Sequence, residues 1–204
     1  WCSWHCSFIF YNPSCSIFAY FGRDVLINCF FFSSDITWYP FLQNLGFKEH
    51  WFGYLASAGY ILGIIVPYWT KSLTKRLGGY KKYLVFFLVL QLLLILSVFF
   101  ANGLFLAIGI YIIFFTTYDF YGPVRSTFFQ HFLPSKMRAT ISSFQSMLYS
   151  LVAIIAAPLA GFMADKIGPQ NTISIGGLLL IPAIIIYLRI NDSKVPKNWL
   201  KRFI

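Results

Sequence analysis

Charged residues are scarce in this sequence, and acidic residues are the scarcest. Only 11% of the 204 residues are charged, with 6 Asp and Glu against 16 Lys and Arg. Ordinary soluble domains carry roughly 25% charged residues, and the surface of a soluble chain needs a polar majority of side chains. The composition therefore argues against a soluble globular protein, and the 58% apolar content excludes intrinsic disorder.

The sequence also lacks the motifs of common catalytic sites. It contains no H-E-x-x-H, no G-x-S-x-G, no P-loop and no paired-Asp lipid transferase motif. Its four cysteines lie within the first 29 residues, and no further metal ligands or disulfide partners for them follow in the sequence. They are Cys2, Cys6, Cys15 and Cys29, which we expect to be free thiols. We therefore expect no enzyme activity, no cofactor and no metal.

Long apolar stretches dominate the chain instead. A membrane-spanning helix needs about 20 mostly apolar residues, and six stretches approach or exceed this length. They cover residues 21–42, 51–70, 83–101, 103–124, 139–164 and 172–188, with turn-forming residues such as Gly46, Gly78 and Gly168 between them. The predicted fold class is an all-α, multi-pass membrane protein with six transmembrane helices.

Basic residues fall on alternate connections between these stretches. They precede the first stretch and follow the second, fourth and sixth: Arg23; Lys71, Lys75, Arg76, Lys81 and Lys82; Arg125, Lys136 and Arg138; and Arg189, Lys194, Lys197, Lys201 and Arg202. The other connections are neutral overall. The positive-inside rule then predicts that both ends of the six-helix unit are cytoplasmic, in a cell membrane. This pattern accounts for the net charge of +10 without nucleic acid, whose binding footprint would cluster on one face.

The two ends of the chain differ from the six-helix unit, which we predict at residues 22–192. Residues 1–21 are apolar but contain Asn12-Pro13. They could be the end of a preceding helix, a cytoplasmic linker or sequence outside the native reading frame. The first residue is Trp1 rather than Met, which is typical of a fragment or a processed chain. Residues 193–204 are predicted to form a basic cytoplasmic tail.

The six stretches form two triads that repeat the same order of features. In each triad the first stretch carries an acid, the second is rich in small residues, and the third is apolar without ionisable groups. The acids are Asp35, in SSDITWYP, and Asp119, in TTYDFYGP, and these segments share a hydroxyl pair, aromatics and a final Pro. Because three helices reverse the direction of the chain, we predict two inverted repeats of the transporter type.

Small residues in the second and fifth stretches predict close helix packing. They are Gly59 and Gly63 in the second stretch, and Ser146, Ser150 and Gly161 in the fifth. The third stretch has a lone polar residue, Gln91, for which we predict a hydrogen bond to a neighbouring helix.

Several motifs then resemble those of one transporter family. Residues 122–169 contain a Pro and a basic residue near the end of the fourth stretch, P-x-x-x-R-A-T from Pro134 to Thr140, and P-L-x-G-x-x-A-D-x-x-G. The segment WTKSLTKRLGGYKK resembles a degenerate copy of the loop motif G-x-x-x-D-R-x-G-R-R. Over residues 22–190 the sequence resembles the C-terminal half of a major facilitator superfamily (MFS) transporter, helices seven to twelve.

The resemblance implies secondary active transport of a small solute by alternating access. The first helix of each triad would line a midplane cavity, and the partner would be a missing N-terminal six-helix half or a second six-helix chain. The conformational-switch and loop-motif positions would be Lys75, Arg76, Gly78, Arg138, Asp165 and Gly168. Lys75 replaces the acid of the loop motif, which argues against a charge-pair latch at that loop.

The acids are the leading candidates for substrate binding and proton coupling. A carboxylate at membrane depth normally faces a bundle interior or a wet cavity, although Ser and Thr hydroxyls of packed neighbours could also satisfy Asp35. Asp119 could serve a gate or pair with Arg125 or Arg138. Aromatic candidates are Trp38, Tyr39, Tyr118 and Tyr121, which could stack on a sugar or aromatic substrate or belong to interfacial belts. The alternative function is a non-transporting six-helix scaffold or assembly subunit, in which packing would close this face.

Overall fold

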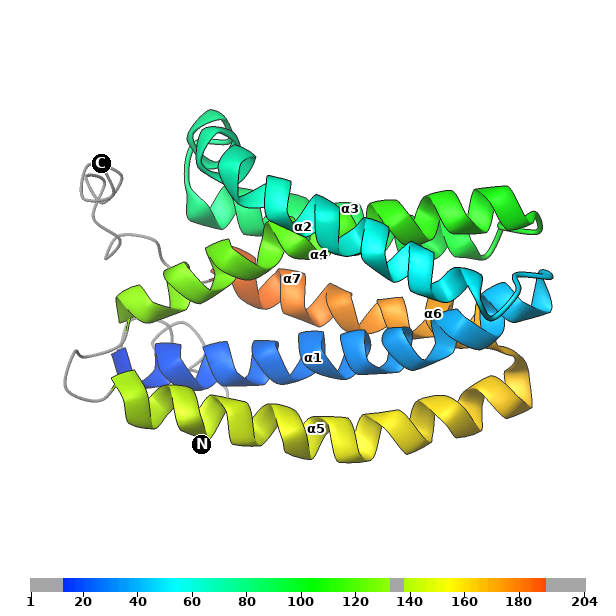
Figure 1. Ribbon diagram of the computed structural model, residues 1–204. Helices are drawn as coiled ribbons and strands as arrows, with labels where there is room; N and C mark the ends of the chain where they lie inside the picture. The colour runs from blue at the N-terminus through cyan, green and yellow to red at the C-terminus, as the bar shows by residue number, and fades with distance from the viewer. Residues whose placement is uncertain (1–12, 133–137, 190–204) are drawn as a thin grey trace.

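The described chain is built from helices that run back and forth (Figure 1). The computed structural model describes residues 13–132 and 138–189. Its elements are α1 (Pro13–Asn44), α2 (Trp51–Arg76), α3 (Tyr80–Val98), α4 (Leu104–Phe132), α5 (Arg138–Ile167), α6 (Pro169–Gly176), the 3-10 turn η2 (Gly177–Leu179) and α7 (Leu180–Arg189). Because α6, η2 and α7 follow one another along one rod, the described residues form six rods.

Four of these rods are long and apolar enough to cross a membrane. They are Tyr80–Val98, Leu104–Gln130, Arg138–Ile167 and Pro169–Arg189. A fifth is α2, if its two parts, Trp51–Val66 and Tyr68–Arg76, count as one span with a bend of 58°. The described chain is therefore all-α, with four or five candidate spans and the character of a multi-pass membrane protein. The rod that falls outside this set is α1, which carries Arg23, Asp24 and Asp35.

The helices extend beyond the apolar stretches where charged residues gather. Because α2 continues to Arg76 and α4 to Phe132, Lys71, Lys75 and Arg125 lie within helices and not in connections. Similarly, α1 begins at Pro13, so the boundary predicted after residue 21 falls inside a helix. Hydropathy marks the end of an apolar surface, whereas Lys and Arg are themselves good helix formers. Residues 1–12 and the predicted tail lie outside the described residues.

Glycine allows two of the tight turns that the sequence predicts. After α2, Gly78 and Gly79 have φ angles of 78° and 129°, and the Gly79 amide donates to the Thr74 carbonyl at 3.2 Å. Between α5 and α6, Gly168 has a φ of 88°. Side chains with a Cβ rarely adopt these angles, so the predicted turns at Gly78 and Gly168 are confirmed.

The first helix of each predicted triad packs against the helices of the other triad. The first rod, α1, contacts α5, α6 and α7, while α4 contacts α2 and α3. At the end of the bundle where α1 begins and α7 ends, Lys81 Nζ donates to the Leu188 carbonyl at 2.9 Å (Figure 1). At the opposite end, Gln170 Nε2 donates to the Val98 carbonyl at 2.9 Å. Each leading helix therefore packs on the second and third rods of the other triad.

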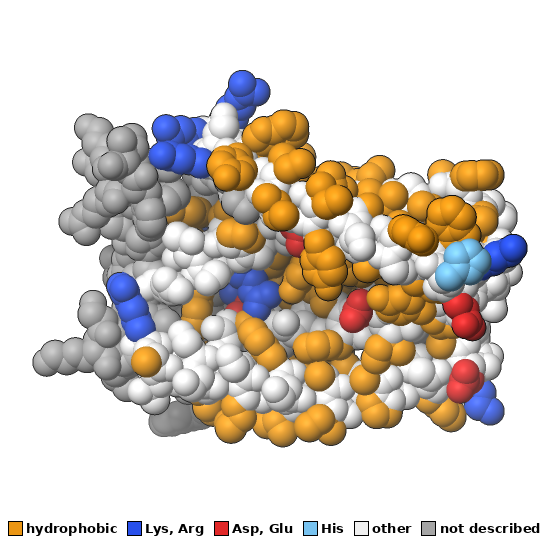
Figure 2. Space-filling model, in the orientation of Figure 1, with side chains coloured by type: hydrophobic (Ala, Val, Ile, Leu, Met, Phe, Trp, Pro, Cys, Tyr) orange, Lys and Arg blue, Asp and Glu red, His pale blue; other side chains and the backbone are white. Residues whose placement is uncertain are grey.

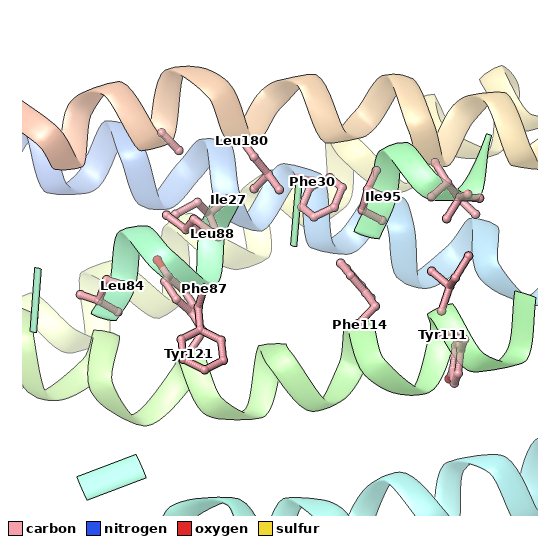
Figure 3. Packing of buried hydrophobic residues seen from close by; sticks show 14 of the residues in the cluster. Ile27, Phe30, Leu84, Phe87, Leu88, Ile95, Tyr111, Phe114, Tyr121 and Leu180 are labelled. Atoms are coloured by element: carbon pink, nitrogen blue, oxygen red, sulfur yellow. The ribbon is translucent and has the colours of Figure 1, made fainter. Parts of the chain in front are cut away.

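The hydrophobic core lies among α1, α3, α4 and α7, where Ile27, Leu88 and Leu180 meet (Figure 3). A Cβ added to Gly177 would lie only 2.5 Å from Ile95 Cγ2, so glycine is required for η2 to approach α3 this closely. The side chain of Gln91 is also fully buried, but neither of its amide atoms has a hydrogen-bond partner among the described residues. The predicted hydrogen bond from Gln91 to a neighbouring helix is therefore wrong within this part of the chain.

Two helices, α2 and α5, leave large apolar side chains outside the core. Ile61 and Tyr68 of α2 are 61% and 80% exposed, and Ile154 of α5 is 68% exposed. In water such faces would be costly, since large contiguous apolar patches are rare on soluble monomers. They fit lipid or the helices of another chain.

Candidate functional site

A cavity of about 520 Å³ opens between α1, α2 and α4. We call it the α1–α2–α4 cavity. Its lining residues are Asp35, Tyr39, Leu55, Ala56, Gly59, Tyr60, Gly63, Ile64, Tyr111, Phe115, Tyr118 and Asp119. A smaller cavity of about 190 Å³ is lined by Asn28, Phe31, Phe32, Asp35, Phe114, Phe115 and Tyr118. The two cavities share Asp35, Phe115 and Tyr118, so they adjoin along α1.

Both predicted acids line the larger cavity, although they come from different triads. Asp35 is exposed and Asp119 is half-buried. Neither carboxylate forms an ion pair or hydrogen bond within the described residues. The neighbouring hydroxyls are engaged elsewhere, since Thr37 donates to the Ser33 carbonyl at 2.7 Å and Thr116 to the Ile112 carbonyl at 2.7 Å. These two hydroxyls therefore do not satisfy the acids.

The glycines of α2 make room for the cavity. A Cβ added to Gly63 would lie 3.4 Å from Asp119 Oδ2, whereas nothing lies within 4 Å of one added to Gly59. Close packing of another helix on Gly59 is therefore absent among the described residues. Instead, both glycines form part of the cavity wall.

The predicted small-residue stripe of α5 faces outward. Ser146 and Ser150 are exposed, and their hydroxyls donate to the Ser142 and Ser146 carbonyls at 3.2 Å. A Cβ added to Gly161 would meet no atom within 4 Å, while the buried small residues of α5 are Ala156 and Ala160. Among the described residues, no helix packs closely on Ser146, Ser150 or Gly161.

Two of the four predicted aromatic residues line the cavity, namely Tyr39 and Tyr118. Trp38 instead lies fully buried, with its ring 5.3 Å from that of Tyr111, so it belongs to the core. Tyr121 is also fully buried, and its hydroxyl lies 3.0 Å from the hydroxyl of Tyr187.

Sequence reasoning missed three further cavity aromatics: Tyr60, Tyr111 and Phe115. On α4, Tyr111 and Phe115 precede Asp119 at successive intervals of four residues. Because residues four apart share a helix face, this spacing is a signal that could have placed both rings beside the acid.

A second polar group, centred on Asp24, joins three helices. Asp24 Oδ1 accepts from Arg23 Nε at 3.0 Å and lies 3.4 Å from Arg125 Nε of α4. Its Oδ2 accepts from Gln145 Nε2 at 2.7 Å and from the Tyr149 hydroxyl at 3.0 Å, both on α5. Arg125 and Gln145 also donate to the Tyr149 hydroxyl. We call these five residues the Asp24 cluster.

The three charged residues of the Asp24 cluster are buried, and the cluster extends toward α7. Arg23 and Asp24 are 0% and 1% exposed, and the Arg23 guanidinium lies 4.2 Å from the centre of the Tyr187 ring. Such an arrangement of cation and ring is attractive. The sequence pattern predicts Arg23 before the first span and offers Arg125 as one of two possible partners of Asp119. The structure places Arg23 inside α1, and Arg125 pairs with Asp24 and not with Asp119.

One face of α1 connects the Asp24 cluster to the cavities. Asn28 lies four residues after Asp24 and seven before Asp35, a spacing that places all three on one helix face. Asn28 lines the smaller cavity, and its Nδ2 donates to the Asp24 carbonyl at 2.6 Å. Figure 2 shows acidic and basic side chains within the hollow between the α2–α4 side of the bundle and the α1–α5 side. Asp24, Asn28 and Asp35 therefore follow one face of α1, with Phe31 and Phe32 between the last two.

The predicted loop-motif residues are divided between the two ends of the bundle. Lys75 and Arg76 are exposed at the end of α2, and Asp165 is exposed at the end of α5, which is the opposite end of the bundle (Figure 1). Arg138, also exposed, begins α5 at the same end as Gly78.

No three His, Cys, Asp or Glu side chains within the described residues gather in a way that could hold a metal. Cys29 is a half-buried free thiol, while the side chains of the other cysteines lie outside the described part.

No family model, curated protein or solved structure matches this chain. The α1–α2–α4 cavity and the Asp24 cluster are therefore the basis on which its function can be inferred.

Proposed function

We propose that this chain is the C-terminal six-helix half of an MFS-type secondary transporter, which moves a small solute by alternating access. The observation that carries the proposal is the α1–α2–α4 cavity, into which the first helix of each triad contributes one carboxylate, Asp35 and Asp119. Transporters commonly hold their substrate where two repeats meet near the middle of the membrane.

The reciprocal packing of the rods supports two inverted repeats. The first helix of each triad contacts the second and third rods of the other triad. The contacts of α1 with α5, α6 and α7 therefore correspond to the contacts of α4 with α2 and α3. Inverted repeats give a transporter two related conformations that open to opposite sides. The cavity, which lies between helices of both triads, would then be exposed to each side in turn.

Coupling to protons is supported by the lack of charged partners for the two cavity acids within the described residues. Neither Asp35 nor Asp119 has a charged partner within the described residues. An unpaired carboxylate at membrane depth is costly, and such residues commonly mark proton or ion pathways. Uptake of a proton removes that cost, so the protonation state of the cavity and its conformation would depend on each other.

The remaining surfaces fit a larger membrane assembly. Basic residues such as Lys75 and Arg76 lie at the end of the bundle where α1 begins and α7 ends, which we assign to the cytoplasm by the positive-inside rule. The exposed apolar faces of α2 and α5 would contact the N-terminal six-helix half or a second six-helix chain. A non-transporting scaffold is the weaker proposal, because it requires a closed face where the cavity opens.

Transport can be tested with the full chain in sealed vesicles that contain a pH-sensitive dye. A panel of amines, sugars, carboxylates and nucleosides is added outside, both to vesicles of purified protein and to native membrane vesicles. We expect one solute class to cause proton flux and to accumulate when a pH gradient is imposed. Absence of uptake and exchange for every class in both preparations would contradict transport.

Asp35→Asn then tests the coupling. The variant should lose accumulation driven by the pH gradient but retain solute exchange, because Asn preserves the shape of the side chain without its charge. Asp165→Asn is the matched control, since Asp165 is exposed at the end of α5 and outside the cavity. Accumulation by Asp35→Asn at the level of the control would contradict proton coupling at this residue.

A further inference from the structure

The charges around the α1–α2–α4 cavity all have one sign. Its lining residues include two carboxylates, Asp35 and Asp119, but no Lys, Arg or His. The buried guanidiniums of Arg23 and Arg125 are engaged by Asp24, outside the cavity lining. An anionic solute would therefore meet repulsion and no compensating cation, whereas a cationic solute would neutralise acids that lack partners within the described residues.

The rest of the wall is aromatic and apolar. Four tyrosines and one phenylalanine line the cavity: Tyr39, Tyr60, Tyr111, Phe115 and Tyr118. Several of these rings are held by neighbours, as the Tyr118 ring lies 4.2 Å from that of Phe31 and the Tyr111 ring 4.5 Å from that of Phe115. Ring faces attract cations, most strongly where water is excluded.

The volume of the cavity and its apolar wall further restrict the class of ligand that it can bind. Its volume of about 520 Å³ lies within the range of sites for drug-sized molecules, roughly 300–1,000 Å³. Leu55 and Ile64 add aliphatic surface, which a metal ion or a small hydrated cation would leave unfilled. A sugar could hydrogen-bond to the tyrosine hydroxyls and to the acids, but it would leave both carboxylates without a compensating charge.

We propose that this cavity binds a lipophilic organic cation, meaning an amine, quaternary ammonium or phosphonium group that carries apolar substituents. The assignment rests on the proposed function, in which the cavity holds the transported solute. The charged centre would lie between Asp35 and Asp119, and the substituents would lie against the rings of Tyr39, Tyr118 and Phe115.

The test measures equilibrium binding of radiolabelled tetraphenylphosphonium to the full chain in nanodiscs of zwitterionic lipid. We expect saturable binding that benzyltrimethylammonium displaces, and no saturable binding of radiolabelled tetraphenylborate, of the same shape but opposite charge, when it is measured alone. The double variant Asp35→Asn/Asp119→Asn should bind at least about tenfold more weakly, and Tyr118→Leu about fivefold more weakly. Asp165→Asn should bind as the natural chain does, and circular dichroism establishes that each variant is folded.

Three results would overturn the cation assignment: no saturable binding to the folded chain, saturable binding of tetraphenylborate alone with similar affinity, or unchanged affinity in the folded double variant. Failure of the proposed function looks different, because it concerns movement and not binding. If a neutral solute accumulates in vesicles while tetraphenylphosphonium does not bind, transport stands and the cation assignment fails. If tetraphenylphosphonium binds through both acids but no solute crosses the membrane, the cation site stands and transport fails.

Discussion

Asp24 of α1 and Arg125 of α4 form an ion pair, with 3.4 Å between Asp24 Oδ1 and Arg125 Nε, beside the buried guanidinium of Arg23. One carboxylate thus faces two buried cations and also receives hydrogen bonds from α5 through Gln145 and Tyr149. Removing one partner of such a group leaves buried charge uncompensated, which costs far more than the pair itself contributes.

Replacement of Asp24 by Asn is therefore expected to lower the free energy of unfolding by about 3–5 kcal/mol. The variant keeps the side-chain shape but leaves Arg23 and Arg125 without their carboxylate. Glu49→Gln, the same chemical change at an exposed residue in the turn before α2, should stay within about 0.5 kcal/mol of the natural chain. Denaturant unfolding in detergent, followed by circular dichroism, measures both, and equal losses would contradict the buried ion pair.

The Asp24 cluster shows where sequence reasoning reaches its limit. A hydropathy pattern treats a charged residue beside an apolar stretch as the end of a span, so it predicts Arg23 at the edge of the membrane. The residues that bind the adjacent Asp24 are Arg125 and Tyr149, which lie in the fourth and fifth rods. A single sequence gives no measure of which distant helices touch, and only that contact makes the charges tolerable at this depth.

Local features were more predictable because they depend on neighbouring residues. The turn at Gly78 follows from the conformational freedom of glycine, and the helical segments follow from long apolar stretches. The repeat predicted equivalent places for Asp35 and Asp119, and both line one cavity. The residue type of Gly59 does not settle its role, since a small residue can either admit a helix or leave a space.

Gly177 offers a stringent test of the core. Gly177→Ala should lower the free energy of unfolding by about 1–3 kcal/mol, because its Cβ would lie 2.5 Å from Ile95 Cγ2 in a fully buried setting. The adjacent variant Gly176→Ala is the matched control, since its Cβ would meet atoms of Phe30 and Ser33 at ordinary distances of 3.7 and 3.8 Å. Thermal unfolding of both variants measures the difference, and a Gly177→Ala variant as stable as Gly176→Ala would contradict the close approach of η2 and α3.

The α1–α2–α4 cavity should admit water-soluble reagents. In a chain whose four cysteines are replaced by serine, Ala56→Cys is expected to react with a charged maleimide, because Ala56 lines the cavity. Ala107→Cys should react at least about tenfold more slowly, since Ala107 is fully buried in α4. Mass spectrometry of the intact protein gives both rates, and comparable rates would mean that the cavity is closed or that the core is open.

Filling the cavity should then slow that labelling. Gly63→Leu places a large side chain where even a Cβ lies 3.4 Å from Asp119 Oδ2, so the reagent should reach Ala56→Cys several-fold more slowly. Gly53→Leu adds the same bulk to α2 at an exposed position where a Cβ meets nothing within 4 Å, and it should leave the labelling rate unchanged. Equal labelling in both variants would show that Gly63 does not face the space reached by the reagent.

Replacement of the buried Gln91 by an apolar residue is expected to stabilise the chain rather than destabilise it. Its amide is fully buried in α3 and makes no hydrogen bond within the described residues, so it bears a desolvation cost without compensation. Gln91→Leu, similar in volume and apolar, should therefore match or exceed the natural chain in unfolding free energy, by up to about 1–3 kcal/mol. Gln145→Leu makes the same change where the amide donates to Asp24 Oδ2 at 2.7 Å, and it should be destabilising. A loss in Gln91→Leu as large as that in Gln145→Leu would mean that the Gln91 amide is satisfied by a group such as water or a residue outside the described ranges.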